Sequence, residues 1–78
     1  MITSAQIRAA RAMLDWSREV FSVHSGIGIS ALMRLENADG IPGGNIKTFE
    51  AVQKTFEKAG IEFIGTPDDG PGVRLHKK

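Results

Sequence analysis

Apolar residues recur at helical spacing near the start of the chain. Thr3, followed by Gln6 three residues later, predicts a capping box that closes the first turn of a helix. An apolar stripe at intervals of three and four residues follows, formed by Ile7, Ala10 and Leu14. We therefore expect a first helix that begins after Thr3 and ends near Asp15.

Residues 16–37 carry the most distinctive pattern of the chain, two short helical segments around a glycine turn. Ser17 can cap a helix over residues 18–25, Gly26 can supply the tight turn, and a second helix follows over residues 28–37. Their apolar positions fall at spacings that face a shared core: Phe21, Ile27, Leu32 and Leu35. This pattern predicts a helix-turn-helix.

The next segment, residues 38–44, interrupts the helical pattern with three glycines and a proline. Asn45 can then cap a fourth helix, and Gly60 can end it. The apolar face of that helix is expected to consist of Phe49, Val52, Phe56 and Ala59.

Beyond Gly60 the hydrophobic period changes from helical to alternating. Apolar residues alternate with polar ones on both sides of T-P-D-D-G-P-G, which occupies residues 66–72. The pattern predicts a terminal β-hairpin over residues 61–76. An isolated hairpin is marginal in water, so its apolar residues need cover from the fourth helix or from a second subunit: Ile61, Phe63, Val73 and Leu75.

Composition narrows the class of protein. The 78 residues, 41% hydrophobic and 24% charged, are expected to form a single globular domain with no separate effector or catalytic domain. Without cysteine, a disulfide scaffold and a thiolate metal site are excluded. No apolar run has the length of a signal peptide or membrane span, from which we expect a cytoplasmic protein with no membrane partner. The net charge of +1 neither favours nor excludes DNA as a partner.

Catalytic and metal chemistry find no support in the residue pattern. His24 and His76 are the only histidines, fall in different expected elements, and lack spaced ligand companions. The glycine-rich segments lack the ending of a phosphate-binding loop, and no nucleophile with a base can be assembled. We expect no enzyme activity, no cofactor and no metal, and we interpret Trp16 as a core or hinge anchor.

Three short motifs support a more specific interpretation: W-S at the entry to the first motif helix, S-G-I in the turn, and L-x-x-L-E-N over residues 32–37. With them, residues 3–59 resemble the Cro/repressor-like (Xre-type) helix-turn-helix family of bacterial and phage transcriptional regulators. The resemblance implies a mainly α-helical fold, a four-helix Cro/repressor-like domain to which this chain adds a C-terminal β-hairpin. It also implies an ion pair between Arg11 on the first helix and Glu36 at the end of the recognition helix.

The same resemblance implies sequence-specific binding of double-stranded DNA, with the second motif helix in the major groove. The groove-facing residues would be Gly28, Ile29, Ser30 and Arg34, of which Arg34 suits bidentate readout of a guanine. Backbone phosphates would be contacted by Arg18 and, at the start of the fourth helix, by Gly44, Asn45 and Lys47. Members of such families often bind paired half-sites, so we expect a homodimer built on residues 61–76.

A protein-interaction module is the alternative function. Gly28 replaces the usual serine or threonine cap, and Val20, Val23 and Met33 stand where the family usually has polar or basic residues. These substitutions favour an antitoxin-like protein partner, or a degenerate helix-turn-helix without base readout. The valines would otherwise be covered by the terminal hairpin or by a dimer partner.

Overall fold

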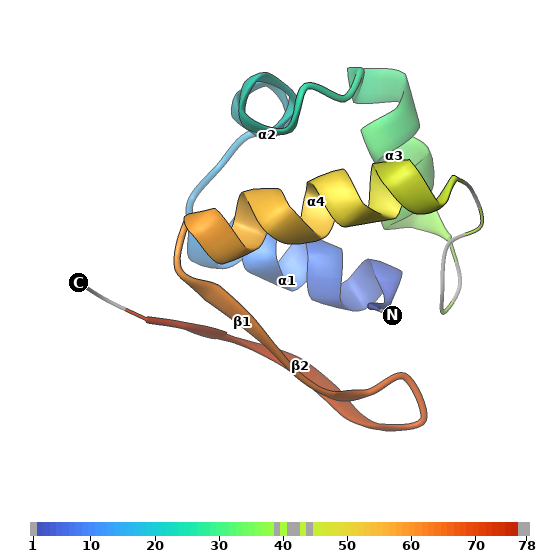
Figure 1. Cartoon of the computed structure of the whole chain (residues 1–78), viewed down its shortest axis with the longest axis vertical. Coiled ribbons are helices and arrows are strands. Elements are labelled where there is room, and N and C mark those ends of the chain that lie inside the picture. The colour runs from blue at the N-terminus through green and yellow to red at the C-terminus, as the bar shows by residue number, and fades with distance from the viewer. Residues whose placement is uncertain (1, 39, 41–42, 44, 77–78) are drawn as a thin grey trace.

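The computed structural model describes residues 2–38, 40, 43 and 45–76, and it is mainly α-helical. Four helices are followed by an antiparallel hairpin (Figure 1). In order, the elements are α1 (Ser4–Met13), α2 (Arg18–Ser25), α3 (Ile29–Asn37), α4 (Ile46–Lys58), β1 (Ile61–Thr66) and β2 (Asp69–Leu75). Among the described residues, no helix is long and apolar enough to cross a membrane.

The capping residues expected from the sequence begin the helices. Thr3 and Gln6 form the capping box of α1, and the Ser17 side chain accepts a hydrogen bond from the Val20 amide at the start of α2. Asn45 caps α4 through the amide of Lys47 at 2.8 Å. These caps satisfy amides that have no partner within the first turn, which is why the helices begin where they do.

The helix ends also follow local backbone chemistry. Gly26 closes α2 in the left-handed conformation, with a φ of 72°, which glycine adopts without steric cost. The first helix ends at Met13, two residues before the expected position, because Asp15 already has a φ of 56°. At the start of α3, Gly28 provides no side-chain hydrogen bond.

The apolar faces of the helices meet in one core, where α1 contacts α3 and α2 contacts α4. The fully buried members expected from the sequence are Ile7, Ala10, Phe21, Leu32, Val52 and Phe56. Phe21 and Phe56 bring their rings to 4.6 Å at the centre. The helical stripes predicted from periodicity are thus confirmed except at Ala59, which follows the end of α4 and is only partly buried.

The hairpin packs against α1 and α4. Ile61 is buried, and Phe63, Val73 and Leu75 are partly buried against the core. The helices of the same chain therefore provide the cover that these residues require.

The hairpin turn is shorter than the sequence suggested. Strand pairing continues to Thr66 and Asp69, so that only Pro67 and Asp68 form the turn, and most of the segment T-P-D-D-G-P-G belongs to the strands. A bulge between Ile64 and Thr66 accommodates the one extra residue of β2. Gly65 is required there, because a side chain would meet the Gly70 carbonyl oxygen at 2.2 Å.

Gln6 fastens the hairpin to α1. Its Oε1 accepts the Thr3 amide at 2.8 Å, while its Nε2 donates to the carbonyl oxygens of Ile64 and Gly72 at 3.2 and 2.9 Å. These last two residues face each other across the strands. One buried amide side chain therefore caps the start of α1 and holds the hairpin against it.

Candidate functional site

Helix α3 presents the expected groove-facing residues to solvent. Gly28, Ile29, Ser30 and Arg34 are all exposed, and Ser30 and Arg34 lie one helical turn apart on the same face. The opposite face buries Leu32 and Leu35 in the core. The exposed side of α3 is thus held on a fixed apolar support.

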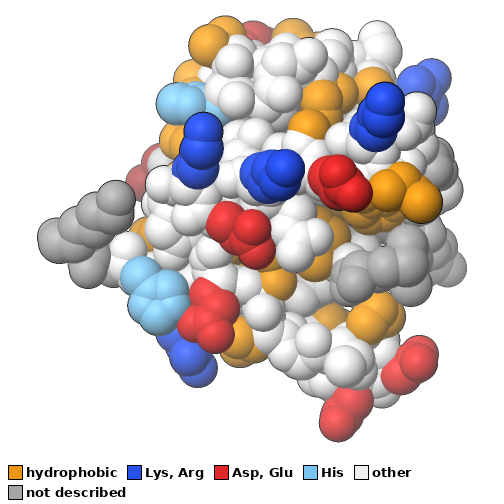
Figure 2. Space-filling model, viewed as in Figure 1, with side chains coloured by type: hydrophobic (Ala, Val, Ile, Leu, Met, Phe, Trp, Pro, Cys, Tyr) orange, Lys and Arg blue, Asp and Glu red, His pale blue; other side chains and the backbone are white. Residues whose placement is uncertain are grey.

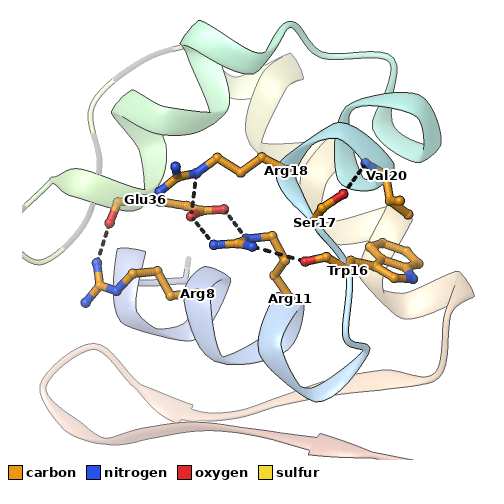
Figure 3. A network of polar contacts seen from close by, with 7 residues as sticks. All are labelled: Arg8, Arg11, Trp16, Ser17, Arg18, Val20 and Glu36. Atoms are coloured by element: carbon orange, nitrogen blue, oxygen red, sulfur yellow. Dashed lines mark hydrogen bonds and ion pairs between the residues drawn. The ribbon is translucent and has the colours of Figure 1, made fainter.

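The carboxyl-terminal end of α3 is held by Glu36, whose side chain is fully buried. Arg11 donates to it twice, from Nε to Oε2 at 2.8 Å and from a terminal nitrogen to Oε1 at 3.0 Å (Figure 3). The structure thus brings together the two residues that the family resemblance pairs. A bidentate arginine fixes both the distance and the orientation of the carboxylate.

Arg18 joins the same cluster. Its Nε donates to Glu36 Oε1 at 3.2 Å (Figure 3). The Arg18 side chain is 33% exposed to solvent. Two arginines share one carboxylate, so the cluster of Arg11, Arg18 and Glu36 has a formal charge of +1. Arg18, expected to contact a phosphate, therefore both bonds the buried Glu36 of α3 and reaches the surface.

Side chains of α1 also satisfy the last carbonyl groups of α3. Ser4 donates its hydroxyl to the Leu35 carbonyl oxygen, and Arg8 donates to the Glu36 carbonyl oxygen. The cation lies at the negative end of the helix dipole, a favourable position. Both the side chain and the backbone of Glu36 are thus fixed by arginines from neighbouring helices.

The start of α4 lies beside α3. Arg34, Asn45 and Thr48 line a common hollow of ≈ 200 Å³, so the groove-facing arginine and the cap of α4 share one surface. Lys47 is exposed in the first turn of α4, whose amide groups point out of the helix end. Gly44, expected at the same helix start, lies outside the described residues.

The four apolar hairpin residues expected to form a dimer interface face the helices of their own chain. Their side chains are therefore packed against the core of their own chain. The sheet has two strands, so each strand still has an outer backbone edge within the described residues. Pairing with a second copy would have to use such an edge.

Apolar residues on α2 and α3 remain exposed. Val23 is 82% exposed, Val20 40% and Met33 41%, and the hairpin packs on α1 and α4 instead of covering them. The expectation that the terminal hairpin covers the valines is therefore wrong within this chain.

The described residues hold no cluster of three or more potential metal-ligating side chains. Comparison of the chain with protein-family models, with curated proteins and with solved structures gives no match.

Two features escaped the sequence analysis. The bond between Arg18 and Glu36 joins residues of different helices, and no local pattern marks it. The parallel stacking of Trp16 on His24 was also missed, although both residues were conspicuous as the only tryptophan and one of two histidines. The sequence did contain a signal for this stacking. The expected cap at Ser17 sets where α2 begins, and this determines the side of the helix on which His24 lies.

Proposed function

We propose that the protein is a small sequence-specific DNA-binding transcriptional regulator of the Cro/repressor-like type. In this proposal α2, the turn at Gly26 and α3 form a helix-turn-helix. Helix α3 is the recognition helix and enters the major groove of double-stranded DNA. Ile29, Ser30 and Arg34 contact base edges.

The observation that carries the proposal is the way α3 is held. Its outer face exposes Ser30 and Arg34 on successive turns, while Glu36 at its end is locked by arginines from α1 and α2. Base readout requires side chains placed to within hydrogen-bonding tolerance, so a rigidly anchored helix suits it. The nine residues of α3 span about 13 Å, close to the width of a major groove, about 12 Å.

Charged groups flank α3 on both sides. Arg18 lies at the start of α2, and Lys47 lies in the first turn of α4, next to the hollow that Arg34 lines. Positive side chains and helix amino ends on either side of a recognition helix suit the two phosphate backbones that border a groove. Specificity in this proposal comes from α3, and orientation comes from Arg18, Asn45 and Lys47.

Binding of paired variants to duplex DNA tests the assignment of roles. Arg34→Ala should lose about 1–3 kcal/mol at the preferred site and relax the preference at one base position, while binding to random duplex stays close to that of the parent. Lys47→Gln should instead weaken all sequences alike and reduce the slope of log affinity against log salt by about one unit. Arg74→Gln on the hairpin removes the same charge away from α3 and serves as the control.

The outcomes separate clearly when affinities are measured by fluorescence anisotropy at several salt concentrations. A parent without affinity for duplex DNA at low salt, or an Arg34→Ala variant with unchanged sequence preference, would contradict the proposed role of α3.

We further propose that the regulator acts as a homodimer that pairs hairpin edges across a two-fold axis. One recognition helix covers few base pairs, and unpaired strand edges are suited to pairing with a second copy. Truncation at Ile61 is not a clean test, because that residue belongs to the core. Sedimentation equilibrium of the whole chain is the direct test, and a monomer at high micromolar concentration would contradict the dimer.

The exposed valines favour a second candidate function, an antitoxin-like module that binds another protein. Val20 and Val23 form an apolar strip on α2, and Val23 is almost fully exposed. Val23→Lys discriminates between the two functions. It should leave DNA affinity unchanged or slightly higher if the protein is a DNA-binding regulator, whereas a module that docks through α2 would lose its protein partner.

A further inference from the structure

A cleft of ≈ 280 Å³ lies between α2 and the carboxyl-terminal half of α4. It is lined by Trp16, His24, Lys54, Thr55, Lys58 and Ala59, none of which belongs to α3. None of these six residues is assigned to a DNA contact, although both helices carry such residues elsewhere.

One wall of the cleft is flat and rigid. The rings of Trp16 and His24 are stacked at 4.4 Å between centroids with an interplanar angle of 1°. Trp16 also lies 5.9 Å from the buried ring of Phe56, with an interplanar angle of 24°. The indole thus contacts both the imidazole and a phenyl ring of the core, which ties this wall of the cleft to the core.

The other wall carries two positive charges. Lys54 and Lys58 are exposed and stand four residues apart, on the same side of α4. Neither ammonium group makes an ion pair with a carboxylate among the described residues, and no acidic residue lines the cleft. Like charges at this spacing repel each other, and an anion between them would remove that repulsion.

The surface view shows the same arrangement. Basic side chains and a histidine lie close together over α2 and the end of α4, and acidic side chains lie beside the basic ones on the side away from the histidine (Figure 2). An apolar surface bordered by convergent polar groups is the usual form of a small-molecule site, and this volume restricts the ligand to a small one.

We propose that this cleft binds a small organic anion consisting of a carboxylate on a planar ring. The carboxylate lies between the ammonium groups of Lys54 and Lys58, and the ring lies against the wall formed by Trp16 and His24. The chemistry requires no metal and no covalent step. None of the lining residues is assigned to a DNA contact.

Benzoate is a suitable probe, and Trp16 is a specific reporter because it is the only tryptophan of the chain. At constant ionic strength, benzoate should change the tryptophan fluorescence in a saturable manner, with half-saturation on the order of 1 mM for a ligand of this size. Neutral benzamide, which has the same shape, should bind about tenfold more weakly. Backbone amide shifts in NMR spectra should be confined to the residues around the cleft.

The double variant Lys54→Gln/Lys58→Gln should weaken benzoate binding by about tenfold, since exposed ion pairs each contribute modestly. Arg74→Gln removes a charge on β2 and should leave benzoate binding unchanged. Both lysines are exposed, so the double variant should retain the circular dichroism spectrum of the parent. Absence of saturation up to 20-fold above the expected half-point, equal binding of benzamide, or equal binding by the double variant would each overturn the proposal.

Discussion

Replacing Glu36 by alanine removes the single carboxylate shared by two arginines. In the folded protein its side chain is fully buried and accepts three hydrogen bonds, two from Arg11 and one from Arg18. The variant leaves both guanidinium groups without their anionic partner. It also leaves a small void at the junction of α1, α2 and α3.

The structure sets the magnitude of the loss. Breaking a fully buried ion pair costs about 3–5 kcal/mol, mostly from the charge left uncompensated. The two arginines retain 23% and 33% exposure, so water partly replaces the lost carboxylate. We therefore expect Glu36→Ala to reduce the free energy of unfolding by about 2–3 kcal/mol. A domain of this size has roughly 4–12 kcal/mol in total, so the loss is a large fraction.

Urea denaturation, followed by Trp16 fluorescence and by circular dichroism, measures the effect. With a slope of about 1 kcal/mol per molar, the midpoint should fall by about 2–3 M. Glu36→Gln retains the shape and one acceptor, and should lose less. Glu50→Gln, at an exposed position on α4, should change stability by no more than about 0.5 kcal/mol. A loss for Glu36→Ala that equals the loss for the Glu50 control would refute the anchoring role of Glu36.

The remaining predictions concern stability and protonation. Arg11→Ala should destabilise the protein by at least about 1 kcal/mol more than Arg18→Ala, because Arg11 donates three hydrogen bonds and Arg18 only one; equal losses in urea denaturation would contradict this. Gly28→Ser should stabilise the protein by about 0.5 kcal/mol, since a side chain there meets open space and can cap α3; a lower thermal midpoint would show that serine cannot adopt the cap. A hydrogen bond from His76 and the nearby arginine on β2 hold the pKa of Glu62 below its ordinary value of 4.5. The contact therefore stabilises the folded state above pH 4.5, and this contribution is lost as the pH falls through the lowered pKa of Glu62. NMR titration should find the pKa of Glu62 below 4.5, and His76→Ala should raise that pKa. A Glu62 pKa at or above 4.5 in the parent would contradict the contact.

The sequence predicted the helices well because their ends depend on local chemistry. Ser17 and Asn45 satisfy amides within three residues of themselves, and Gly26 adopts a backbone conformation that few other residues tolerate. Periodicity then oriented each helix correctly. The buried positions of Phe21 and Phe56 followed from that orientation.

Features that depend on contacts between distant residues could not be predicted in the same way. Gln6 was recognised as a cap, but its two bonds to the hairpin join residues more than fifty positions apart. The bond from Arg18 to Glu36 similarly depends on how α2 crosses α3. The length of the hairpin turn depended on a bulge that allows Gly70 and Pro71 to continue β2.

The exposed apolar residues show the limit of the family resemblance. Their unusual character was visible in the sequence, but whether the hairpin covers Val20 and Val23 depends on where the hairpin packs. It packs on α1 and α4, since Gln6 and the apolar side of the strands direct it there.

Selection of bound duplexes from a random oligonucleotide pool tests the central claim most directly. Successive rounds with the whole chain should converge on one sequence, bound at least about 1,000-fold more tightly than random duplex at physiological salt. The same selection with Arg34→Ala should lose preference at one base position. A pool that stays random after repeated rounds, with no affinity for duplex DNA at low salt, would contradict the account of α3 as a recognition helix.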